Sequence, residues 1–167
     1  MNKILIAYAS QCGSTGEVAQ AIGEVLCARG AQVDVRPVKA VSSLDGYDAV
    51  IVGTAIRAGR CLPEAKAFVE KHQADLGRLP LAYFAVCLAV RAEDAQEREQ
   101  AKTYLDDLKA IVRPAAEALF AGKMDYRRLP LLFKLMMRMM KIQEGDFRDW
   151  AAIRAWAQEI SPLLLTN

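Results

Sequence analysis

Residues 3–16, KILIAYASQCGSTG, join a continuous apolar run to a short polar loop that contains glycine. The run from Lys3 to Ala9 is typical of a strand that is buried on both faces of a parallel sheet. From Ser14 to Arg29 the apolar residues recur at helical spacing, and Gly30 marks the expected end. This stretch therefore predicts a strand, a loop and a helix in immediate succession.

The same alternation continues along the chain. Further strands are expected at residues 32–36, 47–53, 81–87 and 115–120. Further helices are expected at residues 63–72, 93–112 and 150–160. The only histidine, His72, ends the first of these helices and is expected to be exposed. Apolar strands that alternate with helices predict an α/β fold in which helices cover both faces of a five-stranded parallel sheet.

The composition restricts the class of protein. The 167 residues are 53% hydrophobic and 25% charged, as in soluble globular proteins, and we expect one domain over residues 1–167. A formal net charge of +2 is too small to indicate nucleic-acid binding. No apolar run is long enough to cross a bilayer, and the four cysteines, without a C-x-x-C pair, are expected to be reduced thiols. We therefore expect a cytoplasmic protein, with attachment to the inner face of the cell membrane left open.

The loop that follows the first strand suits an anionic ligand. A helix N-terminus presents unpaired N–H groups and a partial positive charge, which favour a phosphate. Gly13 allows the backbone to approach the ligand closely, and hydroxyl groups add hydrogen-bond donors. The candidate phosphate-binding residues are Ser10, Gln11, Cys12, Gly13, Ser14 and Thr15. Because the loop contains no lysine or arginine, neutral dipoles would hold the phosphate.

Other interpretations of this loop fit less well. The Gly-Lys-Ser/Thr ending of a P-loop and the G-x-G-x-x-G dinucleotide fingerprint are both absent. Cys12 suggests a phosphatase nucleophile, but no arginine that would clamp a phosphate follows it. A Ser or Thr helix cap without any ligand stays open. With a single histidine, neither a metal cluster nor a hydrolase triad can be assembled convincingly.

The segment Tyr8–Thr15 resembles the phosphate-binding signature of the flavodoxin family, and the predicted order of elements is similar to that family along the whole chain. The resemblance implies a doubly wound sheet of order 2-1-3-4-5, FMN as cofactor, and ring-binding loops after the third and fourth strands. The ring-binding candidates are Thr54, Ala55, Ile56, Arg57, Cys87, Leu88, Ala89 and Val90. Neither loop contains an aromatic residue, so Ile56, Leu88 or Val90 would cover the ring. Cys61 and Cys87 are expected to be small core residues.

Residues 122–148 are too long for an ordinary connection and are expected to be an insertion with a task of its own. From Arg127 to Lys141 this segment is basic, apolar and rich in methionine, with Lys134, Arg138 and Lys141 on one helix face. Such a helix suits a membrane surface. A surface for a flat hydrophobic substrate and a helix packed on its own domain are open alternatives. We expect FMN binding to be independent of this segment.

A second resemblance is to the menaquinone-dependent protoporphyrinogen dehydrogenases. It rests on Ile56-Arg57 followed by Gly59, on residues 88–91 (LAVR), and on a basic insertion before Asp149-Trp150. Members carry an aromatic residue where this chain has Ala58. The resemblance implies an FMN-dependent oxidoreductase that passes electrons from an apolar tetrapyrrole-like substrate to a membrane quinone.

In this interpretation the flavin performs the chemistry, and no catalytic acid or base is assigned. Arg57, Arg60 and Arg91 would meet substrate carboxylates by paired hydrogen bonds, unless they are solvated loop charges. The alternatives are an electron-carrier flavodoxin that serves a protein redox partner and a flavin-binding regulatory module. Electron carriers usually have a strongly acidic face, which the net charge of +2 does not support.

Overall fold

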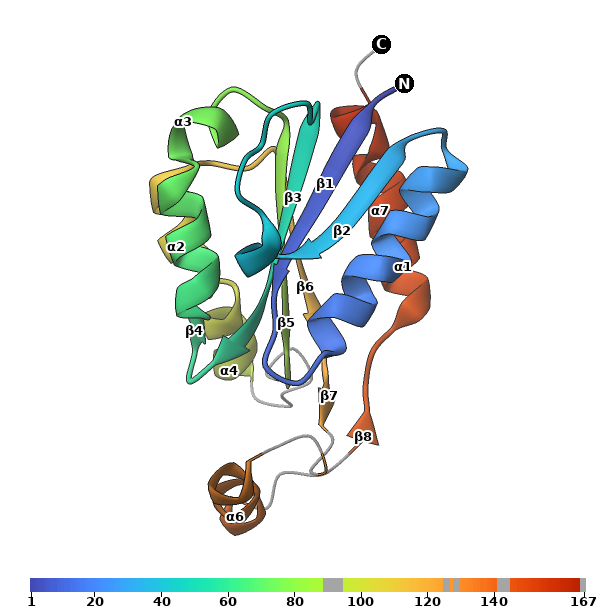
Figure 1. The fold of residues 1–167 in the computed structure, drawn as a ribbon. Coiled ribbons are helices and arrows are strands. Elements are labelled where there is room, and N and C mark those ends of the chain that lie inside the picture. The colour runs from blue at the N-terminus through green and yellow to red at the C-terminus, as the bar shows by residue number, and fades with distance from the viewer. Residues whose placement is uncertain (89–94, 125–126, 128–129, 141–144, 166–167) are drawn as a thin grey trace.

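The computed structural model describes residues 1–88, 95–124, 127, 130–140 and 145–165. Its centre is a parallel sheet in the order β2-β1-β3-β5-β6 (Figure 1). The parallel strands are β1 (Lys3–Ala9), β2 (Gln32–Pro37), β3 (Ala49–Arg57), β5 (Leu81–Cys87) and β6 (Ala116–Ala121). The short β4 (Arg60–Cys61) pairs with β3 in the antiparallel sense. The expected α/β fold and the order of its five parallel strands are therefore confirmed.

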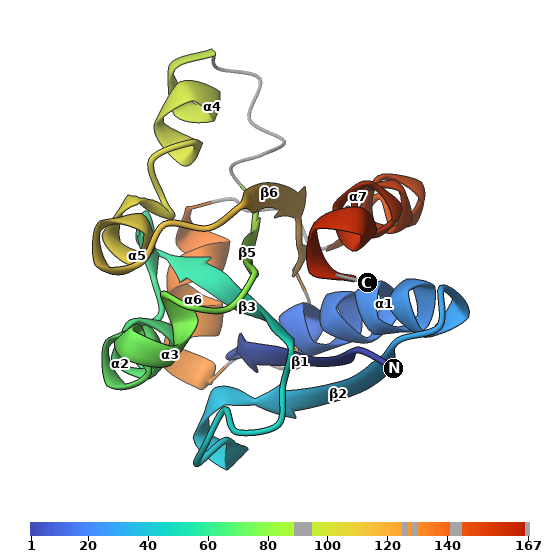
Figure 2. The same cartoon turned by 90° about the horizontal axis from the view of Figure 1, so that it is seen from above.

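Helices cover both faces of this sheet (Figure 2). One face carries α1 (Ser14–Ala28) and α7 (Trp150–Leu164), and the other carries α2 (Pro63–Lys71), α3 (Gln73–Leu76), α5 (Asp106–Ile111) and the 3₁₀ turn η1 (Val38–Ala40). Successive strand residues point to opposite faces, so β1 supplies both cores. Ile4 and Ile6 pack on the α1 side, while Leu5 and Ala7 pack on the α2 side.

The strand register brings three carboxyl ends to one edge of the sheet. Ala9 of β1 pairs with Thr54 of β3, and Ala55 of β3 pairs with Val86 of β5. Figure 1 shows the loop before α1 and the β3–β4 hairpin at this same edge. The fold thus brings the first two predicted ligand-binding segments together, although they are about forty residues apart in the sequence.

The prediction of one unbroken helix over residues 93–112 is wrong. The chain forms α4 (Ala95–Ala101) and α5 with turns between them. The Thr103 hydroxyl donates to the carbonyl oxygen of Gln100 at 2.7 Å, a local hydrogen bond that competes with helical pairing. The break also lets Leu105 enter the core, whereas residues 95–100 are exposed.

The prediction that His72 is exposed is also wrong. Its side chain is 6% exposed, and its ring centroid lies 4.7 Å from that of Phe68. The chain bends between α2 and α3 at this residue, which turns the ring inward. Burial and the nearby Lys71 lower the pKa of His72, with Asp75 opposing them. Its Nε2 atom has no hydrogen-bond partner in the part of the chain that the structure describes.

The described part of residues 122–148 contains three elements, which lie beyond the carboxyl edge of the sheet (Figure 1). The strands β7 (Lys123–Met124) and β8 (Gly145–Asp146) form an antiparallel pair at the base of this segment. The helix α6 (Leu131–Met139) lies between them in the sequence. Among the described helices, none combines the length and the apolar character needed to cross a membrane.

Candidate functional site

The loop after β1 holds the start of α1 close to the end of the strand. The Gly13 N–H donates to Ser10 Oγ at 2.9 Å, and Gly13 has φ 83°, a left-handed conformation that glycine adopts without strain. The Glu17 N–H donates to the Gly13 carbonyl oxygen at 3.2 Å, so helical hydrogen bonding begins there. The earlier N–H groups of α1 have no acceptor within the helix, which is the arrangement that an anion-binding helix terminus uses.

Thr15, in the first turn of α1, is the most informative residue of this loop. Its side chain is completely buried, and Oγ1 has no hydrogen-bond partner among the described residues. A buried hydroxyl group without a partner costs about 1–3 kcal/mol. By comparison, Gln11 is exposed, and Cys12 and Ser14 are half-buried. An orphaned hydroxyl in a helix turn whose first N–H groups lack an acceptor within the helix fits an anionic ligand that accepts hydrogen bonds, such as a phosphate.

The first predicted ring loop is mostly strand. β3 continues to Arg57, and only Ala58 and Gly59 form the turn into β4. Their φ angles are 51° and 75°, and two positive values in succession are typical of type I′ hairpin turns. Ala58 is the only non-glycine residue with positive φ in the described chain. The strand extends because it gains an antiparallel partner that the apolar pattern did not predict.

The Thr54 hydroxyl is engaged inside this hairpin. It donates to the Ala55 carbonyl oxygen at 2.7 Å and accepts from the Leu62 N–H at 3.1 Å. Thr54 is completely buried, whereas Ala55 and Ile56 are half-buried. Thr54 therefore fixes the end of β3 relative to the start of α2, and its hydroxyl is already used.

Arg57 and Arg60 lie directly opposite each other across the β3–β4 pair. Both are exposed, and neither has an ion-pair partner among the residues that the structure describes. Like charges in directly opposed positions destabilise a strand pair. Two exposed arginines in paired positions at the edge of the site therefore suit an anionic ligand with carboxylates, which arginine binds by paired hydrogen bonds.

The second predicted ring loop is only partly described. Cys87 is buried at the end of β5, as expected of a core cysteine, and Leu88 is half-buried. Ala89, Val90 and Arg91 lie outside the described residues. The structure thus brings together residues 10–15, 54–57 and 87–88 at one edge of the sheet.

Tyr104 is an aromatic residue at this edge that sequence reasoning missed. A Cβ atom placed on Gly59 would lie 3.5 Å from Tyr104 Cε1. Burial raises the pKa of the Tyr104 phenol, and the nearby Cys87 adds to the increase. Tyr104 lies in the break between α4 and α5, so the expectation of an unbroken helix gave no reason to place it here.

Cys61 connects the hairpin to the same segment. Its Sγ donates to the Tyr104 carbonyl oxygen at 2.9 Å. Burial, with a smaller contribution from Asp107, raises the pKa of the Cys61 thiol to about 12. The thiol therefore stays protonated at neutral pH and acts as a half-buried packing group, not as a nucleophile.

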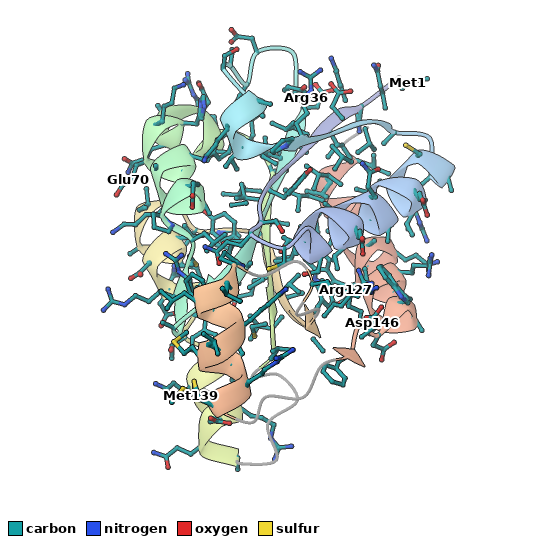
Figure 3. All side chains as sticks on the ribbon, turned by 60° about the horizontal axis from the view of Figure 1, so that its bottom comes forward. Met1, Arg36, Glu70, Arg127, Met139 and Asp146 are labelled. Carbon is teal, nitrogen blue, oxygen red and sulfur yellow. The ribbon has the colours of Figure 1, made fainter. Side chains whose placement is uncertain are left out.

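The helix α6 presents an apolar surface to solvent, and none of its residues is buried. The exposed apolar side chains at this helix are Leu131, Leu132, Leu135, Met136, Met139 and Met140. Lys134 and Arg138 lie beside them at a spacing of four residues, as expected, and Lys141 lies outside the described residues. Figure 3 looks onto this edge and shows α6 in front, with Met139 near its end. Phe133 and Met137 of the same helix are half-buried, so part of its apolar surface is covered and part is exposed.

Comparison with known proteins finds relatives of similar sequence and solved structures of similar fold. Protoporphyrinogen IX dehydrogenase (quinone) of Escherichia coli (strain K12) is 29% identical over 175 residues, which cover 96% of each chain. The protein of the same name from Leishmania major is 26% identical over 178 residues, which cover 98% of this chain and 76% of that protein. A solved short-chain flavodoxin associated with a bacterial microcompartment matches 98% of this chain and 97% of its own with a TM-score of 0.65.

That flavodoxin is only 14% identical in sequence, so its similarity shows the fold alone. The family model described as a flavodoxin domain matches residues 5–150, from within β1 to the first residue of α7. The match includes the helix-terminus loop, the β3–β4 hairpin and the end of β5. The chain belongs to the flavodoxin-domain family.

Proposed function

We propose that this protein is an FMN-dependent oxidoreductase that binds the flavin phosphate at residues Ser10 to Thr15. The observation that carries the proposal is the buried, unpartnered hydroxyl of Thr15 at the start of α1. Flavin binding is implied by the family, and the absence of a dinucleotide fingerprint favours a mononucleotide. Ser10, by accepting the Gly13 N–H, keeps the loop in the shape that exposes the helix terminus.

The flavin ring is proposed to lie between residues 54–57 and 87–90. Because the Thr54 hydroxyl is already engaged, Thr54 would act through the main chain and by fixing the strand end. Tyr104 supplies the aromatic surface that the two ring segments lack. When bound, FMN supplies hydride acceptance and electron transfer, and the protein orients it. No side chain is proposed as a catalytic acid or base.

The substrate is proposed to be an apolar tetrapyrrole-like molecule with carboxylates, and the acceptor a membrane quinone. The names of the two relatives, which mention protoporphyrinogen IX and quinone, support this assignment. Arg57 and Arg60, exposed and unpaired among the described residues, are the groups proposed to bind the carboxylates. The exposed apolar surface of α6, flanked by Lys134 and Arg138, is proposed to contact a membrane with anionic headgroups.

Replacing Thr15 tests the phosphate site. Thr15→Val keeps the shape of the side chain and removes the orphaned hydroxyl. We expect the flavin-free variant to be more stable by about 1 kcal/mol, because it no longer buries a hydroxyl group without a partner. We expect its FMN affinity to fall about tenfold, because the hydroxyl group that would donate a hydrogen bond to the phosphate is gone. Thermal unfolding and quenching of flavin fluorescence measure the two effects. Thr15→Ser retains the hydroxyl and should keep FMN affinity; equal affinity of Thr15→Val and the native protein would contradict the assignment.

Anaerobic turnover tests the activity. The FMN-loaded protein is expected to be reduced by protoporphyrinogen and reoxidised by a soluble menaquinone analogue, as followed by the visible flavin absorption. Arg57→Gln combined with Arg60→Gln should raise KM for the tetrapyrrole more than it lowers kcat. A reduced flavin that quinone leaves unchanged, but that a protein acceptor such as a cytochrome reoxidises, would favour the electron-carrier alternative instead.

A further inference from the structure

Arg148 is the most completely buried guanidinium group among the ion pairs of the described chain, with 5% of its side chain exposed. It lies between β8 and α7, at the end of residues 122–148. Its Nε donates to Asp146 Oδ1 at 2.8 Å and its Nη2 donates to Asp146 Oδ2 at 2.6 Å. Its Nη1 donates to Glu17 Oε2, and its guanidinium carbon lies 4.5 Å from the centroid of the Trp150 ring.

These contacts join three separate parts of the molecule. Asp146 belongs to β8, Trp150 begins α7, and Glu17 lies in the first turn of α1. Two parallel hydrogen bonds to one carboxylate fix the plane of the guanidinium group, which a lysine could not do. The pKa of Asp146 is lowered to about 2, mainly by its hydrogen bond to Arg148. The pair therefore stays ionised at neutral pH.

Glu17 places a negative charge close to the proposed phosphate site. It is the acidic residue of the first helical turn, about 5 Å along the helix axis from Ser14. A carboxylate at this distance opposes the binding of a phosphate dianion. The loop itself has no lysine or arginine to offset that charge. Arg148, which is 131 residues further along the chain, brings a cation to this carboxylate.

We propose that Arg148 is a positioning residue for the phosphate end of the flavin site. It cancels the charge of Glu17 and connects the first turn of α1 to the base of residues 122–148. The inference rests on the proposed binding of FMN at residues 10–15. It replaces the expectation that this segment and the flavin site are independent, because a deletion of residues 122–148 would also remove Arg148.

The test compares the affinities of FMN and riboflavin, which differ only in the phosphate group. Arg148→Met is expected to weaken FMN binding about tenfold more than riboflavin binding, because the Arg148 guanidinium then no longer offsets the charge of Glu17 beside the phosphate. Glu17→Gln alone is expected to raise the ratio of FMN to riboflavin affinity, because it removes a negative charge near the phosphate. The double variant Arg148→Met with Glu17→Gln should recover most of the native ratio. Fluorescence titration gives the affinities, and added salt should reduce the difference.

Arg78→Met is the control, because Arg78 pairs with Asp75 of α3 just before β5, away from the loop, and should leave the ratio unchanged. If Arg148→Met does not fold, Glu17→Gln and Arg148→Lys decide the question. A ratio that Glu17→Gln lowers, or that Arg148→Met leaves unchanged while both affinities fall together, would overturn the inference. A native protein that does not prefer FMN to riboflavin would instead refute the proposed phosphate site.

Discussion

Gly53 and Thr15 differ in whether packing alone explains the residue type at their positions. A Cβ atom at Gly53 would lie 2.1 Å from Phe84 Cζ, so glycine is required for the Phe84 ring to pack against β3. Phe84 in turn contacts the rings of Phe120 and Trp156 edge-on or at a tilt, which connects β5 to β6 and α7. Gly53 is therefore explained by packing alone. Thr15 has a hydroxyl without a partner among the described residues, which packing does not explain and which the proposed phosphate would satisfy.

His72 is expected to make stability depend on pH. Burial lowers the pKa of its ring in the folded protein, so the unfolded chain binds more protons near pH 6.5. The contribution of His72 to the free energy of unfolding is therefore complete above about pH 6.5 and is lost as the pH falls through the folded-state pKa. Urea unfolding at a series of pH values measures this dependence.

The variant His72→Met isolates the effect, because it keeps an apolar contact with Phe68 and cannot titrate. Its unfolding free energy should depend less on pH than that of the native protein between about pH 7 and about pH 5. Lys71→Gln should leave a smaller but detectable dependence, because burial is the larger cause of the lowered pKa. Identical pH profiles of the native and His72→Met proteins would contradict the assignment.

At the scale of elements, short-range sequence patterns predicted the strands and helices whose formation depends mainly on neighbouring residues. The strand, loop and helix from Lys3 to Ala28 followed from an apolar run, a glycine and helical spacing, and the structure has them within one residue. The β3–β4 hairpin was not predicted. Its turn has Ala58 where Asn or Gly is preferred, so the residue that most strongly signals a type I′ turn is missing. The break between α4 and α5 depends on where Leu105 packs, which a helical pattern does not reveal.

The helix α6 is expected to bind anionic membranes. Its exposed leucine and methionine side chains can enter the interface while Lys134 and Arg138 contact headgroups. The native protein should sediment with vesicles that contain phosphatidylglycerol, and much less with neutral vesicles. Leu132→Glu should abolish sedimentation, because it places a charge among the exposed apolar residues. Leu163→Glu, on the exposed side of α7, is the control and should sediment like the native protein. Equal binding of native and Leu132→Glu proteins would exclude α6 as the contact.

At the scale of the whole molecule, the sheet order explains why residues distant in sequence form one site. The order β2-β1-β3-β5-β6 places the end of β1 beside β3, and β3 beside β5. The regular alternation of apolar strands and helices predicted the parallel sheet, and the resemblance to the flavodoxin family implied its order. Arg148 and Tyr104 were not predicted as site residues, because each meets the site only through a tertiary contact and neither lies in a recognisable motif.

Stability is expected to be unevenly distributed between the sheet and α6. Trypsin should cleave first after Lys134 or Arg138, because a helix without buried residues opens at little cost in free energy. Lysines anchored at the sheet should be cleaved later; Lys3, for example, lies 3.5 Å from the Asp34 carboxylate and over the Tyr47 ring. Mass spectrometry of the earliest fragments identifies the sites. First cuts within β1 to β3 would contradict the expectation that the sheet is more stable than α6. Anionic vesicles should slow cleavage in α6 if they cover this helix.

The orphaned hydroxyl of Thr15 has a consequence for the protein in the cell. If the proposed flavin phosphate accepts from this hydroxyl, which has no partner among the described residues, the empty form is closer to unfolding than the loaded form. Cellular proteases remove proteins according to the fraction that is open. When flavin is scarce, the amount of this protein should therefore decline together with the fraction that carries flavin. The supply of riboflavin would then limit both quantities.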